Sequence, residues 1–261
     1  LPALPKYHLP GPGKISTAEI ERIGTACEAW YNQSLAGTVF NGGILVAQKG
    51  TILFEKYRGS LHPGGNDTIN ANTVFHIASV SKTFTAMAIL KLCQEGKLQL
   101  DEELSHYFPS FNYPGVTLRC LLSHRSGLPN YVYFLEKLGW PQNQFASNQD
   151  VLDYLIYRKI ELTDISPACT RFSYCNTNYA VLALQNEKVT GISYPAYMKQ
   201  NFFDPLAMDH SFVLSAKDSA KATPSFDWRG NAIPLNYLDF VYGDKNIFST
   251  ARDLLKWDRF L

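Results

Sequence analysis

The sequence predicts an α/β (α+β) protein in which an antiparallel sheet is flanked by helices and joined to a mainly helical region. Two runs rich in β-branched and aromatic residues, 43–48 and 51–57, are separated only by Lys49-Gly50, which is typical of a β-hairpin. Residues 19–33 before the hairpin and much of the chain after residue 79 follow the period of amphipathic helices. We therefore expect a hairpin with a helix packed on it, followed by a helical domain.

The other elements are predicted from turn and cap residues. The proline-rich residues 1–14 predict an extended arm, and Ser16 or Thr17 can cap the helix that follows it. A polar, glycine-rich loop over 61–72 leads to the next strand. The further elements expected are a strand at 73–77 and helices at 79–96, 98–108, 117–122, 148–157, 179–189, 194–203 and 250–261.

These elements divide the chain into three parts. Residues 1–78 form the arm, helix and first strands of an α/β domain, residues 79–245 form a mainly helical domain, and residues 246–261 return as a helix to the α/β domain. No strand is predicted after residue 77, so one hydrophobic edge of the sheet is expected to be uncovered. We therefore expect an incomplete sheet, with the remainder missing from this chain.

Composition limits the classes of function. The 261 residues include 24 basic and 23 acidic side chains with no basic block, which argues against nucleic acid or anionic membranes as partners. The chain has no run of 18 or more apolar residues, so no membrane-spanning helix is expected. It begins at Leu1, which indicates processing or engineering. These features favour a small-molecule or peptide substrate.

The five cysteines are scattered along the chain. Cys27, Cys93, Cys120, Cys169 and Cys175 lack metal-ligand spacing, so we expect no metal site and mainly buried thiols. A bridge between Cys169 and Cys175 is the alternative.

Ser79 and Lys82 form an S-x-x-K motif where the strand at 73–77 gives way to a helix. Three residues span about one helical turn, so the lysine amine can reach the serine hydroxyl. The positive end of the helix stabilises negative charge on Ser79 and disfavours an ammonium at Lys82, as burial also would. This pattern predicts a nucleophilic serine with a lysine base, although about one such motif is expected by chance in a chain of this length.

Tyr174 and Asn176 form a Y-x-N motif on a polar turn before the helix at 179–189. The phenol can pass a proton to a leaving group, and the carboxamide can hold a substrate amide. The ordinary explanation is that Tyr174 is one of fifteen tyrosines and Asn176 a turn residue. Because each motif occurs once and S-x-x-K precedes Y-x-N, the two together favour a catalytic site.

Together the motifs resemble the serine β-lactamase and penicillin-binding protein family, most closely its class C β-lactamase, DD-peptidase and esterase branch. Further segments resemble the family in the same order: 73–79 (TVFHIAS), 121–129 (LLSHRSGLP), 187–191 (EKVTG), 205–208 (PLAM) and 247–254 (IFSTARDL). The resemblance implies a β-lactamase/transpeptidase-like fold and a periplasmic or secreted location. It gives no cofactor and no oligomeric state.

Carried over by position, the resemblance implies that Ser79 is the acylated nucleophile and Lys82 its base. It makes Tyr174 a general acid/base and Asn176 a contact for the substrate amide. His124 matches a family position with a structural role. These roles agree with those reached from the residue chemistry alone.

The chain departs from the family pattern in its third motif, [KH]-[ST]-G or H-x-G, which lies on a strand opposite the serine. The stretch 188–191 (KVTG) is one residue too long, and 62–64 (HPG) precedes the serine. Only one oxyanion donor, the Ser79 N–H, is then expected from this chain, and a lost donor typically costs about 10²–10³ in rate. Ala207 also replaces the glycine of the family's P-L-G-M.

The function predicted is a serine hydrolase that cleaves an amide or ester, such as a β-lactam, a D-amino-acid peptide or a small ester, through a Ser79 acyl-enzyme. The alternative is a non-catalytic penicillin-recognising scaffold that binds peptidoglycan-like peptides or a partner protein. A structural α/β protein with fortuitous motifs is the third reading. The sequence does not choose among the substrates, because pocket shape decides between them.

Overall fold

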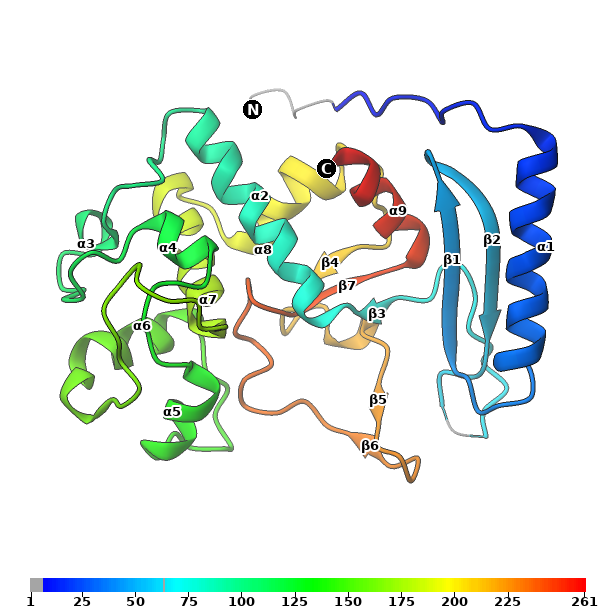
Figure 1. Ribbon diagram of the computed structural model, residues 1–261. Coiled ribbons are helices and arrows are strands. Elements are labelled where there is room, and N and C mark those ends of the chain that lie inside the picture. Colours follow the sequence, from blue (N-terminus) through cyan, green and yellow to red (C-terminus); the bar gives the residue numbers. More distant parts are fainter. Residues whose placement is uncertain (1–6, 63) are drawn as a thin grey trace.

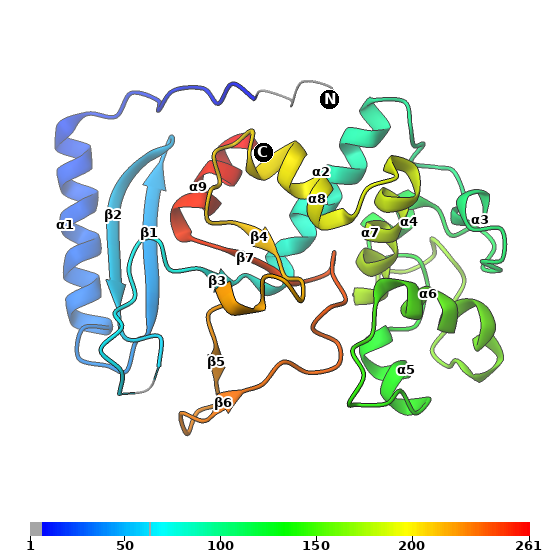
Figure 2. The ribbon, with the colours of Figure 1, turned by 180° about the vertical axis from the view of Figure 1, so that it is seen from behind.

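The computed structural model describes residues 7–62 and 64–261 and combines a hairpin unit with a helical unit (Figure 1). The hairpin and its covering helix lie at one side, α3 to α7 lie at the other, and α2, α8 and α9 lie between them. Figure 2 shows the same order from behind. None of the helices in the described part of the chain is long and apolar enough to cross a bilayer.

The hairpin forms as the sequence predicts. Strand β1 (Gly42–Gln48) pairs antiparallel with β2 (Thr51–Arg58), with a register shift at Val46/Ala47. Lys49 and Gly50 both have positive φ angles, of 50° and 78°, as a tight two-residue hairpin turn requires. Helix α1 (Thr17–Ser34) packs against β2, and Ser16 caps it by accepting a hydrogen bond from the Glu19 N–H.

A second, three-stranded sheet leads to Ser79. Strand β3 (Phe75–His76) pairs antiparallel with β7 (Ile247–Ser249), which also pairs with β4 (Phe212–Val213). Strands β5 (Ser225–Phe226) and β6 (Ala232–Ile233) form a separate pair. The prediction of no strand after residue 77 was wrong, because strands of two or three residues are too short to show alternation.

The helices largely follow the predicted pattern. The segment at 148–157 is observed with the predicted bounds, 98–108 shortens to four helical residues, and 131–137 was not predicted. The helical elements are η1 (Ala78–Val80), α2 (Ser81–Gln94), α3 (Leu104–Tyr107), α4 (Leu118–Leu122), α5 (Tyr131–Lys137), α6 (Asn148–Tyr157), η2 (Lys159–Glu161), α7 (Asn176–Thr190), α8 (Tyr194–Met198), η3 (Lys199–Phe203), η4 (Ser219–Lys221) and α9 (Ala251–Phe260).

Helix α7 is the centre of the helical unit. Its residues 177–186 are all buried, and it contacts α2, α4, α5, α6 and α8. A helix buried on every side is fixed in position by its neighbours. The first residues of α7 are therefore held rigidly beside the first turn of α2.

The N-terminal arm runs along the surface from the hairpin towards α9 (Figure 1). The Gly13 N–H donates to the Lys49 carbonyl at 2.9 Å, and the ring of Tyr7 lies 4.7 Å from that of Phe260. Over residues 7–14 the predicted extended arm is confirmed. Residues 1–6 of that prediction lie outside the described residues.

Candidate active site

Ser79 lies in the short η1 turn between β3 and α2. Pairing of β3 with β7 fixes the entry to this turn, and Ala78 adopts a left-handed φ of 45°. A non-glycine residue rarely takes this conformation, so the backbone beside Ser79 is strained. The turn leaves Ser79 exposed to solvent.

Two other groups reach the Ser79 hydroxyl. Lys82 Nζ donates to Ser79 Oγ at 3.1 Å, and the Tyr174 hydroxyl donates to the same oxygen at 2.8 Å. Lys82 is one turn along α2 and Tyr174 directly precedes α7, so the packing of α2 on α7 brings the two motifs together.

The Lys82 amine is buried, with 6% of the residue exposed, and has three acceptors. Besides Ser79 it donates to Asn176 Oδ1 and to the Asp244 carbonyl, both at 2.8 Å. An ammonium uses all three acceptors. A neutral amine can give its two hydrogens to Asn176 and Asp244 and direct its lone pair at Ser79.

Tyr174 and Asn176 flank the start of α7. Asn176 is the first helical residue, and its side chain points to Lys82. Tyr174 is 49% exposed, and its ring centroid lies 4.9 Å from Lys82 Nζ. The structure thus brings all four predicted site residues together, on the solvent side of the α2–α7 contact.

His124 supports the Y-x-N segment from behind. Its Nδ1 accepts a hydrogen bond from the Cys175 N–H at 3.1 Å, and its ring centroid lies 4.4 Å from that of Tyr174. Burial, together with the charge of Lys82, lowers the pKa of His124. These contacts agree with the structural role that the family position implies.

Asp244 belongs to the site but was not predicted. It follows Gly243, whose φ is 98°, where an added Cβ would lie 2.4 Å from the Tyr179 carbonyl oxygen of α7. Only glycine allows the chain to pass so close to α7 and present the Asp244 carbonyl to Lys82. A main-chain contact of this kind leaves no side-chain motif to recognise.

The prediction of mainly buried thiols was wrong for Cys120 and Cys169, and the alternative bridge between Cys169 and Cys175 is not observed. Cys120 in α4 is bridged to Cys169 in the loop that leads to Tyr174, whereas Cys175 is free and buried. The Cys175 thiol donates to the Leu128 carbonyl at 3.4 Å, so it faces away from Cys169. Cys120 and Cys169 are 49 residues apart, and the sequence carries no local signal for such a pair.

Of the two rejected third-motif stretches, 188–191 lies at the opposite end of α7 from Asn176. Thr190 ends α7, whose 15 residues span about 22 Å from Asn176 at 1.5 Å per residue. Its hydroxyl donates to the Asn186 carbonyl. For 62–64, Pro63 is outside the described residues, and the His62 ring is paired with Asp67.

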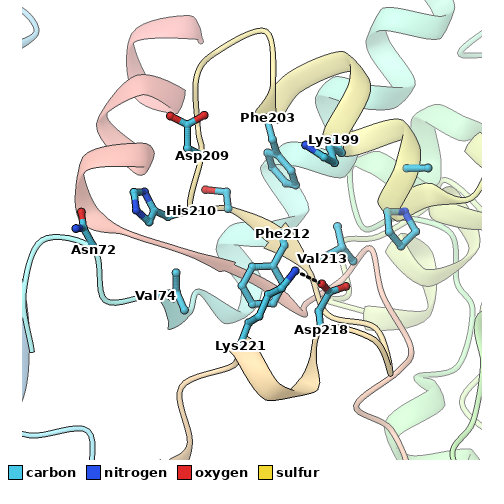
Figure 3. A pocket seen from close by; sticks show the side chains of 13 residues that line it. Asn72, Val74, Lys199, Phe203, Asp209, His210, Phe212, Val213, Asp218 and Lys221 are labelled. Carbon is cyan, nitrogen blue, oxygen red and sulfur yellow. Dashed lines mark hydrogen bonds and ion pairs between the residues drawn. The ribbon is translucent and has the colours of Figure 1, made fainter. Parts of the chain in front are cut away.

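Two cavities differ in whether the predicted site residues line them. One of about 600 Å³, lined by Lys199, His210 and Phe212 among others, contains none of the four predicted residues (Figure 3). Its Lys221 is paired with Asp218 at 2.8 Å. Another, of about 430 Å³, has Tyr174 and Asn176 in its wall but neither Ser79 nor Lys82, so it borders the Y-x-N side of the site.

No cluster of three or more His, Cys, Asp or Glu side chains suited to a metal ion occurs within residues 7–62 and 64–261. The groups that converge here are a hydroxyl, an amine, a phenol and a carboxamide. This set suits acyl transfer to serine.

Comparison with known proteins gives the same family. The family model described as Beta-lactamase matches residues 28–261. Penicillin-binding protein 4* of Bacillus subtilis is 31% identical over 239 residues, which cover 85% of this chain and 52% of that protein. FmtA from Staphylococcus aureus has a similar crystal structure, with a TM-score of 0.74 and 24% identity, covering 94% of this chain and 66% of that one.

A class C beta-lactamase structure also matches, with a TM-score of 0.71 and 20% identity over 94% of this chain and 65% of that one. These two structures confirm the predicted fold class. The chain spans about half the length of the curated relatives it matches. Because the family match extends over residues 28–261, the chain belongs to the beta-lactamase family, as its motifs predicted.

Proposed function

We propose that this chain is a serine hydrolase that cleaves an amide or ester through an acyl-enzyme on Ser79. The observation that carries the proposal is the sharing of one hydroxyl oxygen, Ser79 Oγ, by Lys82 and Tyr174. The substrate class is a β-lactam, a D-amino-acid peptide or a small ester. Membership of the beta-lactamase family supports the reaction type.

In the acylation step, the neutral Lys82 amine takes the Ser79 proton while Ser79 Oγ forms a bond to the substrate carbonyl carbon. The electron pair of the carbonyl moves onto its oxygen. Asn176 and the Asp244 carbonyl hold the amine in position, because they accept its other two hydrogens. The Ser79 N–H beside the start of α2 is suited to stabilise the oxyanion.

Collapse of the tetrahedral intermediate releases the leaving group. The Tyr174 hydroxyl lies 2.8 Å from Ser79 Oγ, so it is placed to give a proton to the departing amine or alcohol and to recover one through Lys82. Water then attacks the acyl carbon, and the proton transfers reverse. The 49% exposure of Tyr174 leaves room for that water.

We also propose a periplasmic or secreted location. The Cys120–Cys169 bridge supports it, because disulfides persist mainly in oxidising compartments. No partner beyond the small-molecule or peptide substrate is proposed.

Rapid mixing with an activated chromogenic ester tests the proposed function. We expect a burst of about one product per chain followed by slower turnover, because an activated ester acylates the serine faster than water hydrolyses the acyl-enzyme. Ser79→Ala should show no burst. Ser123→Ala, which removes an exposed hydroxyl bonded to the Arg119 carbonyl, is the matched control and should keep the burst. Saturable binding without any burst or turnover would instead indicate a non-catalytic penicillin-recognising scaffold.

A further inference from the structure

A buried carboxyl group lies directly behind the candidate active site. Asp244 is 1% exposed, and its Oδ2 accepts a hydrogen bond from the Tyr131 hydroxyl at 3.0 Å. Its other oxygen, Oδ1, has no hydrogen-bond partner in the part of the chain that the structure describes. A buried carboxylate with an unsatisfied oxygen is costly, so its presence calls for an explanation.

The position of Asp244 relative to Lys82 suggests an explanation for this buried carboxylate. The main-chain carbonyl of Asp244 accepts a hydrogen bond from Lys82 Nζ at 2.8 Å. The residue that carries the buried carboxyl group is therefore in direct contact with the amine. Lys82 makes no ion pair within 4 Å among the described residues. The titratable groups that face the carboxyl from the surrounding elements are Lys82, Lys245, Tyr131, Tyr194 and Cys175.

Only the two lysines in this set can be cations. Lys245 has its own partners, because its amine donates to the Leu238 carbonyl at 2.9 Å and lies 3.5 Å from Asp239 Oδ1. Lys82 has neutral acceptors only. Both lysines act against burial and lower the pKa of Asp244, Lys245 more than Lys82, and Lys82 is the one of the two without an ion-pair partner within 4 Å among the described residues.

We propose that Asp244 is a positioning residue for the base, an inference that rests on the proposed function. Its carbonyl orients the Lys82 amine, and its carboxylate stabilises the ammonium that forms when the Ser79 O–H bond breaks and a new N–H bond forms on Lys82. The anion thus makes the amine a stronger base at the moment of attack. Such a group contributes through charge, so asparagine cannot replace it.

The effect of Asp244 on the stability of the fold provides a second, independent test of its role. Burial raises the pKa of Asp244 from its ordinary value of 3.8 to about 6. The ionised form is therefore disfavoured in the fold, and stability is lost as the pH rises from about 4 through about 6. Asparagine does not ionise, so the Asp244→Asn variant does not lose stability over this pH range. The carboxylate is kept at a site where it destabilises the fold, as is common for functional groups.

The test compares Asp244→Asn with wild type across pH 5–8. We expect acylation of Ser79 by an activated ester to fall about tenfold or more at pH 7.5. The acidic limb of the pH–rate profile should move to lower pH by about one unit, because removal of a nearby anion favours the uncharged form of a base. The melting temperature at pH 7.5 should rise by several degrees.

Asp253→Asn is the matched control. Asp253 is equally buried, at 1% exposure, but both its oxygens are satisfied, by the His210 N–H, the Ser211 hydroxyl and the Lys256 amine. Its substitution should lower the melting temperature and leave the acidic limb in place. The contrast separates a carboxylate that serves catalysis from one that serves the fold.

Any of three results would overturn the inference. If Asp244→Asn melts at a lower temperature at pH 7.5 and its acidic limb does not move, Asp244 is a structural residue. If wild type shows neither a burst nor steady turnover, the proposed function fails first and takes this inference with it. A normal wild-type burst with an unchanged Asp244→Asn profile rejects the inference alone.

Discussion

Replacing Lys82 by alanine is expected to lower the rate of Ser79 acylation by about 10²–10⁴-fold, the usual contribution of a positioned general base. In wild type the Lys82 amine is the group placed to take the proton, at 3.1 Å from Ser79 Oγ. Tyr174 donates to the same oxygen and cannot substitute for the base while its phenol is protonated. The measurement is the single-turnover rate of acylation by an activated ester at pH 7.5.

The control for this prediction is another lysine of α2. Lys91 lies two and a half turns further along the helix, and its amine pairs with Glu95 at 2.9 Å. Lys91→Ala should therefore acylate at close to the wild-type rate. If Lys82→Ala retains a rate within about threefold of wild type, a difference too small for a lost general base, another group must remove the Ser79 proton.

Breaking the Cys120–Cys169 bridge is expected to lower the free energy of unfolding by about 4 kcal/mol, from the loop-closure entropy of a 49-residue loop. The bridge ties α4 to the loop that precedes Tyr174, so its loss frees a long segment of the unfolded chain. Denaturant titration of wild type with and without dithiothreitol measures the effect. The double variant Cys120→Ser/Cys169→Ser should match the reduced wild type.

Cys27→Ser provides the control, because this thiol is free and lies in α1. It should unfold near the wild-type midpoint and remain sensitive to dithiothreitol. Equal midpoints for oxidised and reduced wild type, with free thiols confirmed in the reduced sample, would show that the bridge does not stabilise the fold.

The parts of the fold that the sequence predicted are those with a local physical signal. The hairpin at 42–58 follows from β-branched runs around a turn with glycine, and the helix predicted at 148–157 is α6, which the structure shows to begin at a capping box formed by Ser147 and Asp150. Ser79 and Lys82 could be paired from helical geometry alone. Their partners Tyr174 and Asn176 required the second motif, because no local rule spans that separation.

The parts that were missed depend on tertiary packing. Strand β7 is three residues long and exists because β3 and β4 lie on either side of it. Asp244 contacts Lys82 through its carbonyl, and any residue type offers a carbonyl, so sequence reasoning had no reason to select it. The Cys120–Cys169 pair likewise depends on how α4 meets a distant loop.

The most direct test of the proposed acyl-enzyme is the intact mass of the protein after brief incubation with a penicillin or an activated ester, followed by peptide mapping. A single adduct on the peptide containing Ser79, absent from Ser79→Ala, is the expected result. An adduct that maps to another residue or persists in Ser79→Ala, or no adduct with either reagent, would contradict the catalytic role proposed for the four converging side chains.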